Sequence, residues 1–113
     1  LEVFSSADWM IHLAWLDHCP NTVVEALSQN CSVVCTDSGG THEIVRENGV
    51  VIKETAEYNF ELADYDRPYG LRLDNFDVSK LFEKKTFDNS YLQIEKVAKM
   101  YEKVFMSALG EID

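Results

Sequence analysis

The chain has 113 residues, a formal net charge of −10 and a hydrophobic content of 46%. This length suffices for one domain, and the apolar content excludes an intrinsically disordered chain. The acidic excess makes a nucleic-acid backbone an unfavourable partner. The sequence shows no stretch of 18 apolar residues and no signal peptide. We therefore expect a cytoplasmic protein. Any peripheral association with a membrane would involve parts of the protein that are not present here.

Residues 9–15 (WMIHLAW) form a nearly continuous apolar run, which predicts a strand buried on both faces of a parallel sheet. The chain then turns into a helix expected over about residues 20–29. Pro20 suits the first helical position because its φ is fixed there and its missing N–H would have no partner. Thr22 and Glu25 also have the spacing of a capping box, which would start the helix one or two residues later.

Two carboxylates flank the start of this helix, Asp17 on the loop before it and Glu25 within it. The amides and positive dipole end of the helix should face the carboxyl edge of the sheet, where open α/β sheets bind ligands and an anion is favoured. Glu25 should lie about 7 Å along the axis from the helix start. One acid could then bind a ligand that lies beside the helix, and the other could face the reacting end of that ligand. Alternatively, Glu25 completes the capping box and Asp17 is a solvated loop acid.

The next segments are predicted in the order strand, turn, helix, strand: residues 32–36, 36–40, 41–47 and 50–53. Strands that alternate with short helices predict βαβ units and a parallel sheet. The turn contains Gly39 and Gly40, which permit positive φ. These glycines either let a ligand approach the backbone closely or simply form a tight turn.

Residues 54–75 have no clear period and predict an irregular acidic loop. Asp77 is expected to cap a helix that ends by residue 85, and a longer helix is expected over about residues 88–109, where Gly110 ends it. An apolar stripe runs along this last helix, and we expect it to belong to the core. The stripe consists of Ile94, Val97, Ala98, Tyr101, Val104, Phe105 and Ala108.

The three cysteines lack metal-site spacing. We expect reduced thiols, with Cys31 and Cys35 near or in the second strand and buried rather than reactive. Cys19 lies on the loop that precedes the first predicted helix. A nucleophilic role for it is disfavoured because no partner base can be identified.

A series of short motifs follows in a fixed order along residues 7–52: Asp17 and Glu25 separated by seven residues, Glu25-Ala26-Leu27, Ser32-Val33-Val34, Gly39-Gly40 and Glu43-Ile44-Val45. Their order and register resemble the second domain of the retaining glycosyltransferases of family 4, which have the GT-B fold of two facing Rossmann-like domains. The chain departs from that pattern at two positions. Asp17 stands where the family usually has Glu, and Asn30 stands where Gly usually closes the helix.

The resemblance implies an α/β fold with a Rossmann-like parallel sheet. The chain would be the C-terminal half of a GT-B nucleotide-sugar-binding domain with a C-terminal helical extension. Residues 1–113 would then form a single partial domain: a βαβαβ donor-site core over 1–53, the loop over 54–75 and helices over 76–113. The N-terminal GT-B domain would be missing, as would the family's basic phosphate clamp, so this piece alone is expected to be inactive.

The activity implied is that of a retaining, hexosyl-type glycosyltransferase, which moves a sugar from a nucleotide-diphosphate sugar, UDP- or GDP-linked, to an acceptor. No cofactor and no metal is implied. Asp17 would be the catalytic residue near the transferred sugar, and Glu25 would bind the ribose hydroxyls. The donor-binding residues implied in full are Glu25, His18, Cys19, Pro20, Asn21, Thr22, Gly39 and Gly40.

Two other functions stay open. The first is a non-catalytic, glycosyltransferase-like module that binds nucleotide or acts as a scaffold, and the shorter acid at Asp17 favours it. The second, a phosphatase or dehydrogenase half, ranks lower. The Gly-x-Gly-x-x-Gly fingerprint is absent, and no nucleophile at a strand end has an identifiable base beside it.

Overall fold

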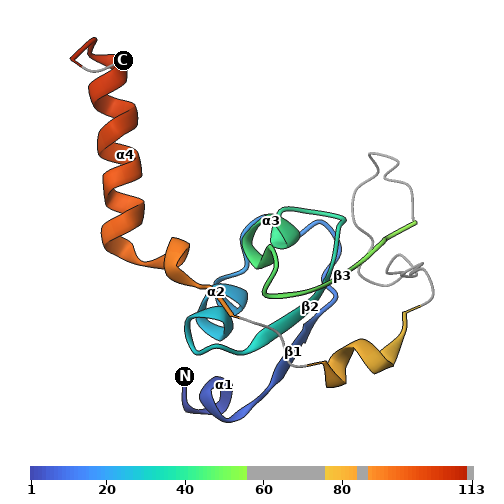
Figure 1. Cartoon of the computed structure of the whole chain (residues 1–113). Helices are drawn as coiled ribbons and strands as arrows, with labels where there is room; N and C mark the ends of the chain where they lie inside the picture. Colours follow the sequence, from blue (N-terminus) through green and yellow to red (C-terminus); the bar gives the residue numbers. More distant parts are fainter. Residues whose placement is uncertain (56–75, 84–86, 112–113) are drawn as a thin grey trace.

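A computed structural model describes residues 1–55, 76–83 and 87–111. They form a mixed α/β structure in which short helices accompany a parallel sheet and a long C-terminal helix leads away from it (Figure 1). The elements follow in the order α1 (Glu2–Ser6), β1 (Trp9–His12), α2 (Asn21–Ser28), β2 (Ser32–Thr36), α3 (Thr41–Val45), β3 (Gly49–Ile52), η1 (Val78–Phe82), η2 (Ser90–Leu92) and α4 (Ile94–Ala108). The mixed α/β class and the parallel sheet predicted from the sequence are confirmed.

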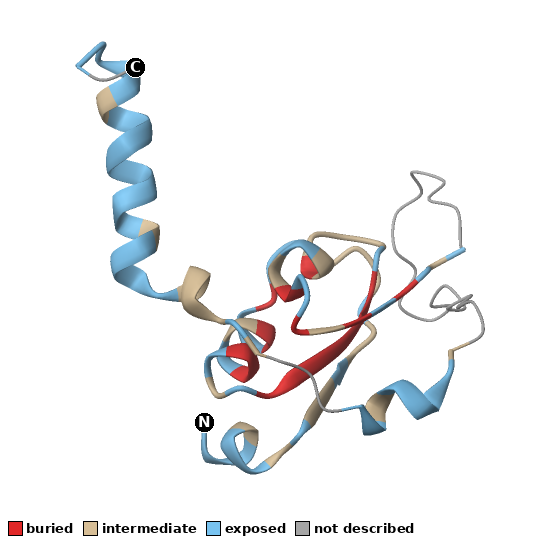
Figure 2. Ribbon diagram, viewed as in Figure 1, coloured by how far each residue is buried: buried red, intermediate tan, exposed pale blue. Residues whose placement is uncertain are grey.

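The three described strands lie in the order β1-β2-β3, and each neighbouring pair is parallel. β2 is central, and all of its residues are buried (Figure 2). Its bounds are those predicted from the sequence, whereas β3 begins and ends one residue earlier than predicted. β2 is therefore the central strand of the described sheet, and both β1 and β3 pair with it.

The prediction for β1 was wrong in two respects. The strand ends at His12 instead of continuing to Trp15, and it is not buried on both faces, because Ile11 is 64% exposed. Within the described residues β1 is an edge strand that pairs only with β2. An apolar run alone does not tell how many neighbours a strand has.

The core lies between the sheet and the helices α2 and α3. Because the strands follow one another in sequence order, right-handed crossovers place both helices on the same face. α2 contributes side chains spaced by three and four positions, which form one helical stripe. The buried cluster comprises Val23, Ala26, Leu27, Cys31, Val33, Cys35 and Val45.

The capping box predicted at the start of α2 is not formed. The helix begins at Asn21, with Pro20 as its N-cap and no side-chain cap hydrogen bond. Thr22 is therefore already the second helical residue, and its hydroxyl is too far inside the helix to act as a cap. At the other end Asn30 adopts a φ of 58°, which confirms that it closes the helix in the left-handed conformation.

Side-chain hydrogen bonds attach the C-terminal part to this core. The side chain of Asn48, which is 2% exposed, donates to the carbonyl of Asp88 at 2.6 Å and accepts from its amide at 3.0 Å. The hydroxyl of Tyr91 donates to the carbonyl of Ile44, and the side-chain amide of Asn89 donates to the carbonyl of Leu27 at 3.0 Å. These contacts hold the segment before α4 against α2 and α3.

The apolar stripe of the last helix was wrongly assigned to the core. The helix begins at Ile94, later than predicted, and of the stripe only Val97 is half-buried, whereas Ile94 and Phe105 are 72% and 62% exposed. Figure 2 shows the reason, since α4 leads away from the sheet and the described elements do not cover most of its length. Gly110, at a φ of 74°, follows the helix as expected.

The helix predicted after Asp77 is confirmed: it ends before residue 85, and Asp77 caps it as predicted. η1 is a 3₁₀ helix that ends at Phe82, and Asp77 caps it by accepting a hydrogen bond from the amide of Ser79 at 2.9 Å. Most of the acidic loop predicted over residues 54–75 lies outside the described residues. None of the helices in the described ranges is long and apolar enough to cross a membrane.

Substitution of Leu27 tests whether the α2 stripe carries the stability of the core. Leu27 is fully buried, so Leu27→Ala should lower the free energy of unfolding by about 2–5 kcal/mol through the lost apolar contact and the cavity left behind. Urea denaturation measures the change. The matched control is Leu109→Ala at an exposed position, which should change stability by less than about 0.5 kcal/mol. Equal effects of the two substitutions would contradict the assignment of the core.

Candidate functional site at the carboxyl edge of the sheet

Two loops meet where the strands end. The β1–α2 loop and the β2–α3 loop both leave the carboxyl edge of the parallel sheet, and hydrogen bonds join them. The amide of Gly40 donates to the carbonyl of Asp17 at 2.9 Å, and the amide of Leu16 donates to the hydroxyl oxygen of Ser38 at 3.2 Å. The structure therefore brings Asp17 and the glycine turn together, as expected for segments that follow neighbouring parallel strands.

Gly39 and Gly40 are required here for their lack of a side chain. A Cβ on Gly39 would lie 2.2 Å from the carbonyl oxygen of Asp17, and a Cβ on Gly40 would lie 2.2 Å from that of His18. Neither glycine uses the positive φ that it permits. The β1–α2 loop occupies the space that their missing side chains leave. Their predicted contact with a ligand stays a prediction.

The carboxylate of Asp17 faces an imidazole that the sequence analysis did not single out. Its Oδ2 lies 3.2 Å from Nε2 of His12, the last residue of β1. One signal could have found it: His12 interrupts an apolar run five residues before an acid. The pair lies at the carboxyl edge of the sheet, where the site was predicted.

The other predicted site residues lie along the same loop and the first turns of α2. His18, Cys19, Asn21, Thr22 and Glu25 are exposed, whereas Pro20 is buried as the N-cap. Helix geometry leaves the first amides of α2 without an acceptor inside the helix, so this end of the helix can bind an anion. No hydrogen bond or ion pair in the described part of the chain joins Asp17 to Glu25.

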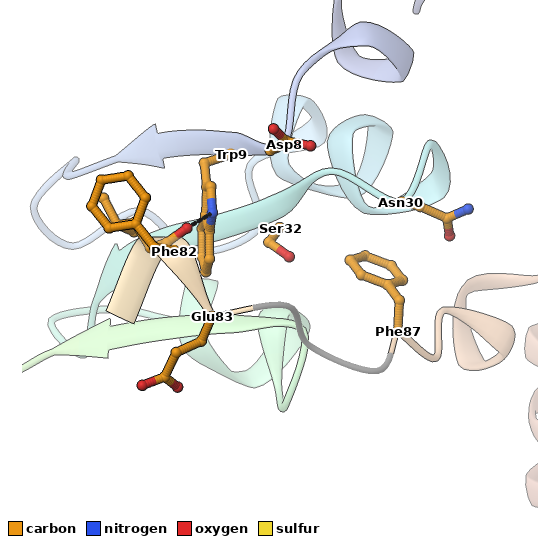
Figure 3. Close-up of a pocket in the computed structure, with 8 residues that line it drawn as sticks. Asp8, Trp9, Asn30, Ser32, Phe82, Glu83 and Phe87 are labelled. Atoms are coloured by element: carbon orange, nitrogen blue, oxygen red, sulfur yellow. Dashed lines mark hydrogen bonds between the residues drawn. The ribbon is translucent and has the colours of Figure 1, made fainter. Parts of the chain in front are cut away.

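A hollow of about 430 Å³ lies at the opposite, amino edge of the sheet (Figure 3). Its lining residues come from the starts of β1 and β2 and from the segments around η1: Asp8, Trp9, Asn30, Ser32, Leu81, Phe82, Glu83 and Phe87. The indole N–H of Trp9 donates to the carbonyl of Leu81 at 2.7 Å, which attaches η1 to the sheet. This hollow shares no residue with the predicted site. We place the candidate site at the carboxyl edge because the exposed polar groups and helix amides converge there.

Burial makes two of the three thiols unreactive. It raises the pKa of Cys35 to about 11, with the nearby charge of Asp37 as a smaller cause, and it raises the pKa of Cys31 with a smaller contribution from Asp8. Both cysteines are buried, as predicted, and Cys19 is exposed. Within residues 1–55, 76–83 and 87–111, no three His, Cys, Asp or Glu side chains are grouped so as to hold a metal ion.

In comparisons with known proteins, no family model matched the chain, and neither the curated proteins nor the solved structures gave a significant match. The resemblance to glycosyltransferases thus rests on the sequence motifs alone. The assignment of the fold rests on the structure alone.

The contact between the two loops can be tested at a single amide. Gly39→Ala should push the Asp17 carbonyl away from its partner and speed the hydrogen exchange of the Gly40 amide, at a cost in stability of about 1–3 kcal/mol. Exchange measured by NMR reports the effect. The control is Gly110→Ala, where no atom lies within 4 Å, and it should leave the exchange of Gly40 unchanged. An unaltered Gly40 amide in the Gly39 variant would show that the loops do not depend on this contact.

Thiol labelling tests the burial of the cysteines. At pH 8 a disulfide reagent should modify one thiol of the folded protein rapidly, and Cys19→Ser should remove that rapid phase. Cys35 should stay unmodified because its pKa of about 11 keeps it protonated and its burial blocks access. Reaction of all three thiols should require denaturant. Rapid labelling of two or more thiols in the folded state would contradict the structure.

Proposed function

We propose that this chain contributes the donor site of a retaining glycosyltransferase that uses a nucleotide-diphosphate sugar. In this proposal the sheet is the C-terminal part of a Rossmann-like GT-B domain. The observation that carries the proposal is the placement of Asp17. It lies against the Gly39–Gly40 turn, directly before the amino end of α2, and this juxtaposition has the order of the glycosyltransferase motifs.

The amino end of α2 suits the diphosphate of such a donor. The first amide to donate within the helix is that of Val23, which bonds to the carbonyl of Pro20, so the amides of Asn21 and Thr22 have no partner within the helix. Together with the helix dipole they favour a negatively charged group. As the bond to the sugar breaks, the nucleoside diphosphate gains negative charge, and donors that are already in place stabilise it. The leaving group would therefore lie at this end of α2.

Glu25 and Asp17 take different parts of the donor in this proposal. Glu25 is exposed on α2 beyond the helix start, where its carboxylate can accept hydrogen bonds from the two ribose hydroxyls. Asp17 lies on the loop beside the helix end and would face the transferred sugar. The proposal involves no metal. It requires a facing N-terminal domain and the basic phosphate clamp, which these residues do not contain, as well as an acceptor.

A non-catalytic nucleotide-binding module is the second candidate. The shorter acid at Asp17 favours it, because a carboxylate one methylene shorter than glutamate reaches less far toward a ligand. The two functions differ in turnover. Sugar transfer by the full-length protein would exclude the second candidate, whereas nucleotide binding without transfer would support it.

Calorimetric titration of the full-length protein with UDP, GDP, ADP and their sugar conjugates tests the proposed donor site. One nucleotide should bind selectively. Glu25→Ala should weaken that binding by about 10- to 150-fold, since it removes a charge-assisted contact worth about 1.5–3 kcal/mol. The matched control is Glu95→Ala in the first turn of α4, which should leave the affinity unchanged. Unchanged affinity in a folded Glu25 variant would refute the role of this residue.

A further inference from the structure

The pairing of His12 with Asp17 joins the end of a strand to the loop that carries the candidate catalytic acid. Nε2 of His12 and Oδ2 of Asp17 are 3.2 Å apart, a distance typical of a hydrogen bond or ion pair. His12 is the last residue of β1, and β1 pairs with the fully buried β2. The imidazole is therefore carried by a strand that pairs with the buried central strand of the sheet.

The exposed fractions of the two side chains indicate which of them supports the other. The side chain of His12 is 15% exposed and that of Asp17 is 33% exposed. The imidazole is thus the more buried member of the pair, and the carboxylate is the member more open to a ligand. His12 is placed to orient Asp17, and the reverse arrangement, in which an acid orients a histidine toward substrate, fits these exposures less well.

The backbone of Asp17 is held independently of its side chain. Its carbonyl accepts a hydrogen bond from the amide of Gly40 at 2.9 Å, and Leu16 before it is bound to Ser38. With the backbone fixed, the remaining freedom of the acid is rotation about its side-chain bonds. Contact with His12 removes that freedom.

Other charged groups at this edge do not replace Asp17 as the partner of His12. Cys35 is the register neighbour of His12 on β2, and burial raises its pKa to about 11, so it is a neutral thiol near pH 7. Asp37 accepts a hydrogen bond from the amide of Glu54 at 2.8 Å. The side chain of His18, on the loop itself, is exposed. Asp17 is the carboxylate within salt-bridge distance of His12 in the described part of the chain.

We propose that His12 is a positioning residue for sugar transfer: its imidazole holds the carboxylate of Asp17 in the orientation that faces the donor sugar. This inference rests on the proposed function and adds to it a residue outside the glycosyltransferase motifs. A carboxylate one methylene shorter than glutamate reaches less far, so its direction matters more. Displacement of a reacting group by about 1 Å can cost on the order of 100-fold in rate.

The test is steady-state kinetics of the full-length protein with its nucleotide-sugar donor. His12→Ala should lower kcat by about 10- to 100-fold and change KM for the donor by less than about threefold, because Glu25 and the amides of α2 are untouched. Binding of the free nucleoside diphosphate should not change. His12→Gln should recover a large part of kcat, because its side-chain amide can donate from a position close to that of Nε2.

A second comparison separates positioning from general damage. If His12 acts through Asp17, then His12→Ala should change kcat by less than about twofold when it is made in the Asp17→Asn variant. An equal loss in both backgrounds would overturn the inference, as would an unchanged kcat in the His12→Ala variant. A parallel loss of nucleoside diphosphate binding would also overturn it, because that outcome indicates collapse of the loop.

Failure of the proposed function gives a different result. If the wild-type full-length protein neither binds nor transfers a nucleotide sugar, the proposed function fails and this inference fails with it. If the wild type is active and His12→Ala is equally active, only the inference fails. Should the His12→Ala variant be unfolded by circular dichroism, His12→Gln provides the comparison: kcat near that of the wild type supports the inference, and a loss as large as that of Asp17→Asn overturns it.

Discussion

The candidate site depends on the close contact between the β1–α2 and β2–α3 loops. Gly40 donates its amide to the carbonyl of Asp17, and both glycines of the turn lie where any side chain would collide with the other loop. The distance between the loops is therefore set by backbone atoms, which do not change rotamer. This contact fixes where Asp17 lies relative to the turn that follows β2.

The same arrangement connects the site to the core. β2 is buried along its whole length, and Cys35 near its end lies in the cluster formed with α2 and α3. The loops leave the sheet directly after these packed residues. Polar groups at the carboxyl edge are thus held by rigid elements, although the edge itself is open to solvent, and this is the arrangement from which α/β proteins build ligand sites.

The C-terminal helix α4, in contrast, lies largely outside this core. Its amphipathic pattern is strong enough to form a helix, and hydrogen bonds of Asn48 and Tyr91 anchor the segment before it. Most of its apolar stripe is nevertheless exposed. Periodicity reports that a helix has an apolar face. It does not report which element covers that face, because the covering residues belong to another part of the structure.

Local physics allowed much of this protein to be predicted. The bounds of β2 followed from a run of small and β-branched residues between turn signals, the left-handed closure by Asn30 followed from its short polar side chain, and the burial of Cys31 and Cys35 followed from their place around β2. The location of Asp17 and of the glycine turn at one edge of the sheet followed from the parallel direction of the strands. Each of these properties depends on neighbouring residues or on the alternation of strand and helix.

What the sequence by itself determined is the α/β alternation, the parallel sheet and the edge at which the polar residues gather. Only the tertiary structure decided that β1 is a strand with one exposed face, that the glycines serve a close backbone contact, and that His12 meets Asp17. The starts of α2 and α4 also escaped prediction: Pro20 lies one position outside α2, and α4 begins only at Ile94. The physical reason is common to most of these differences: they depend on distances between atoms of separate segments, which local residue patterns do not encode.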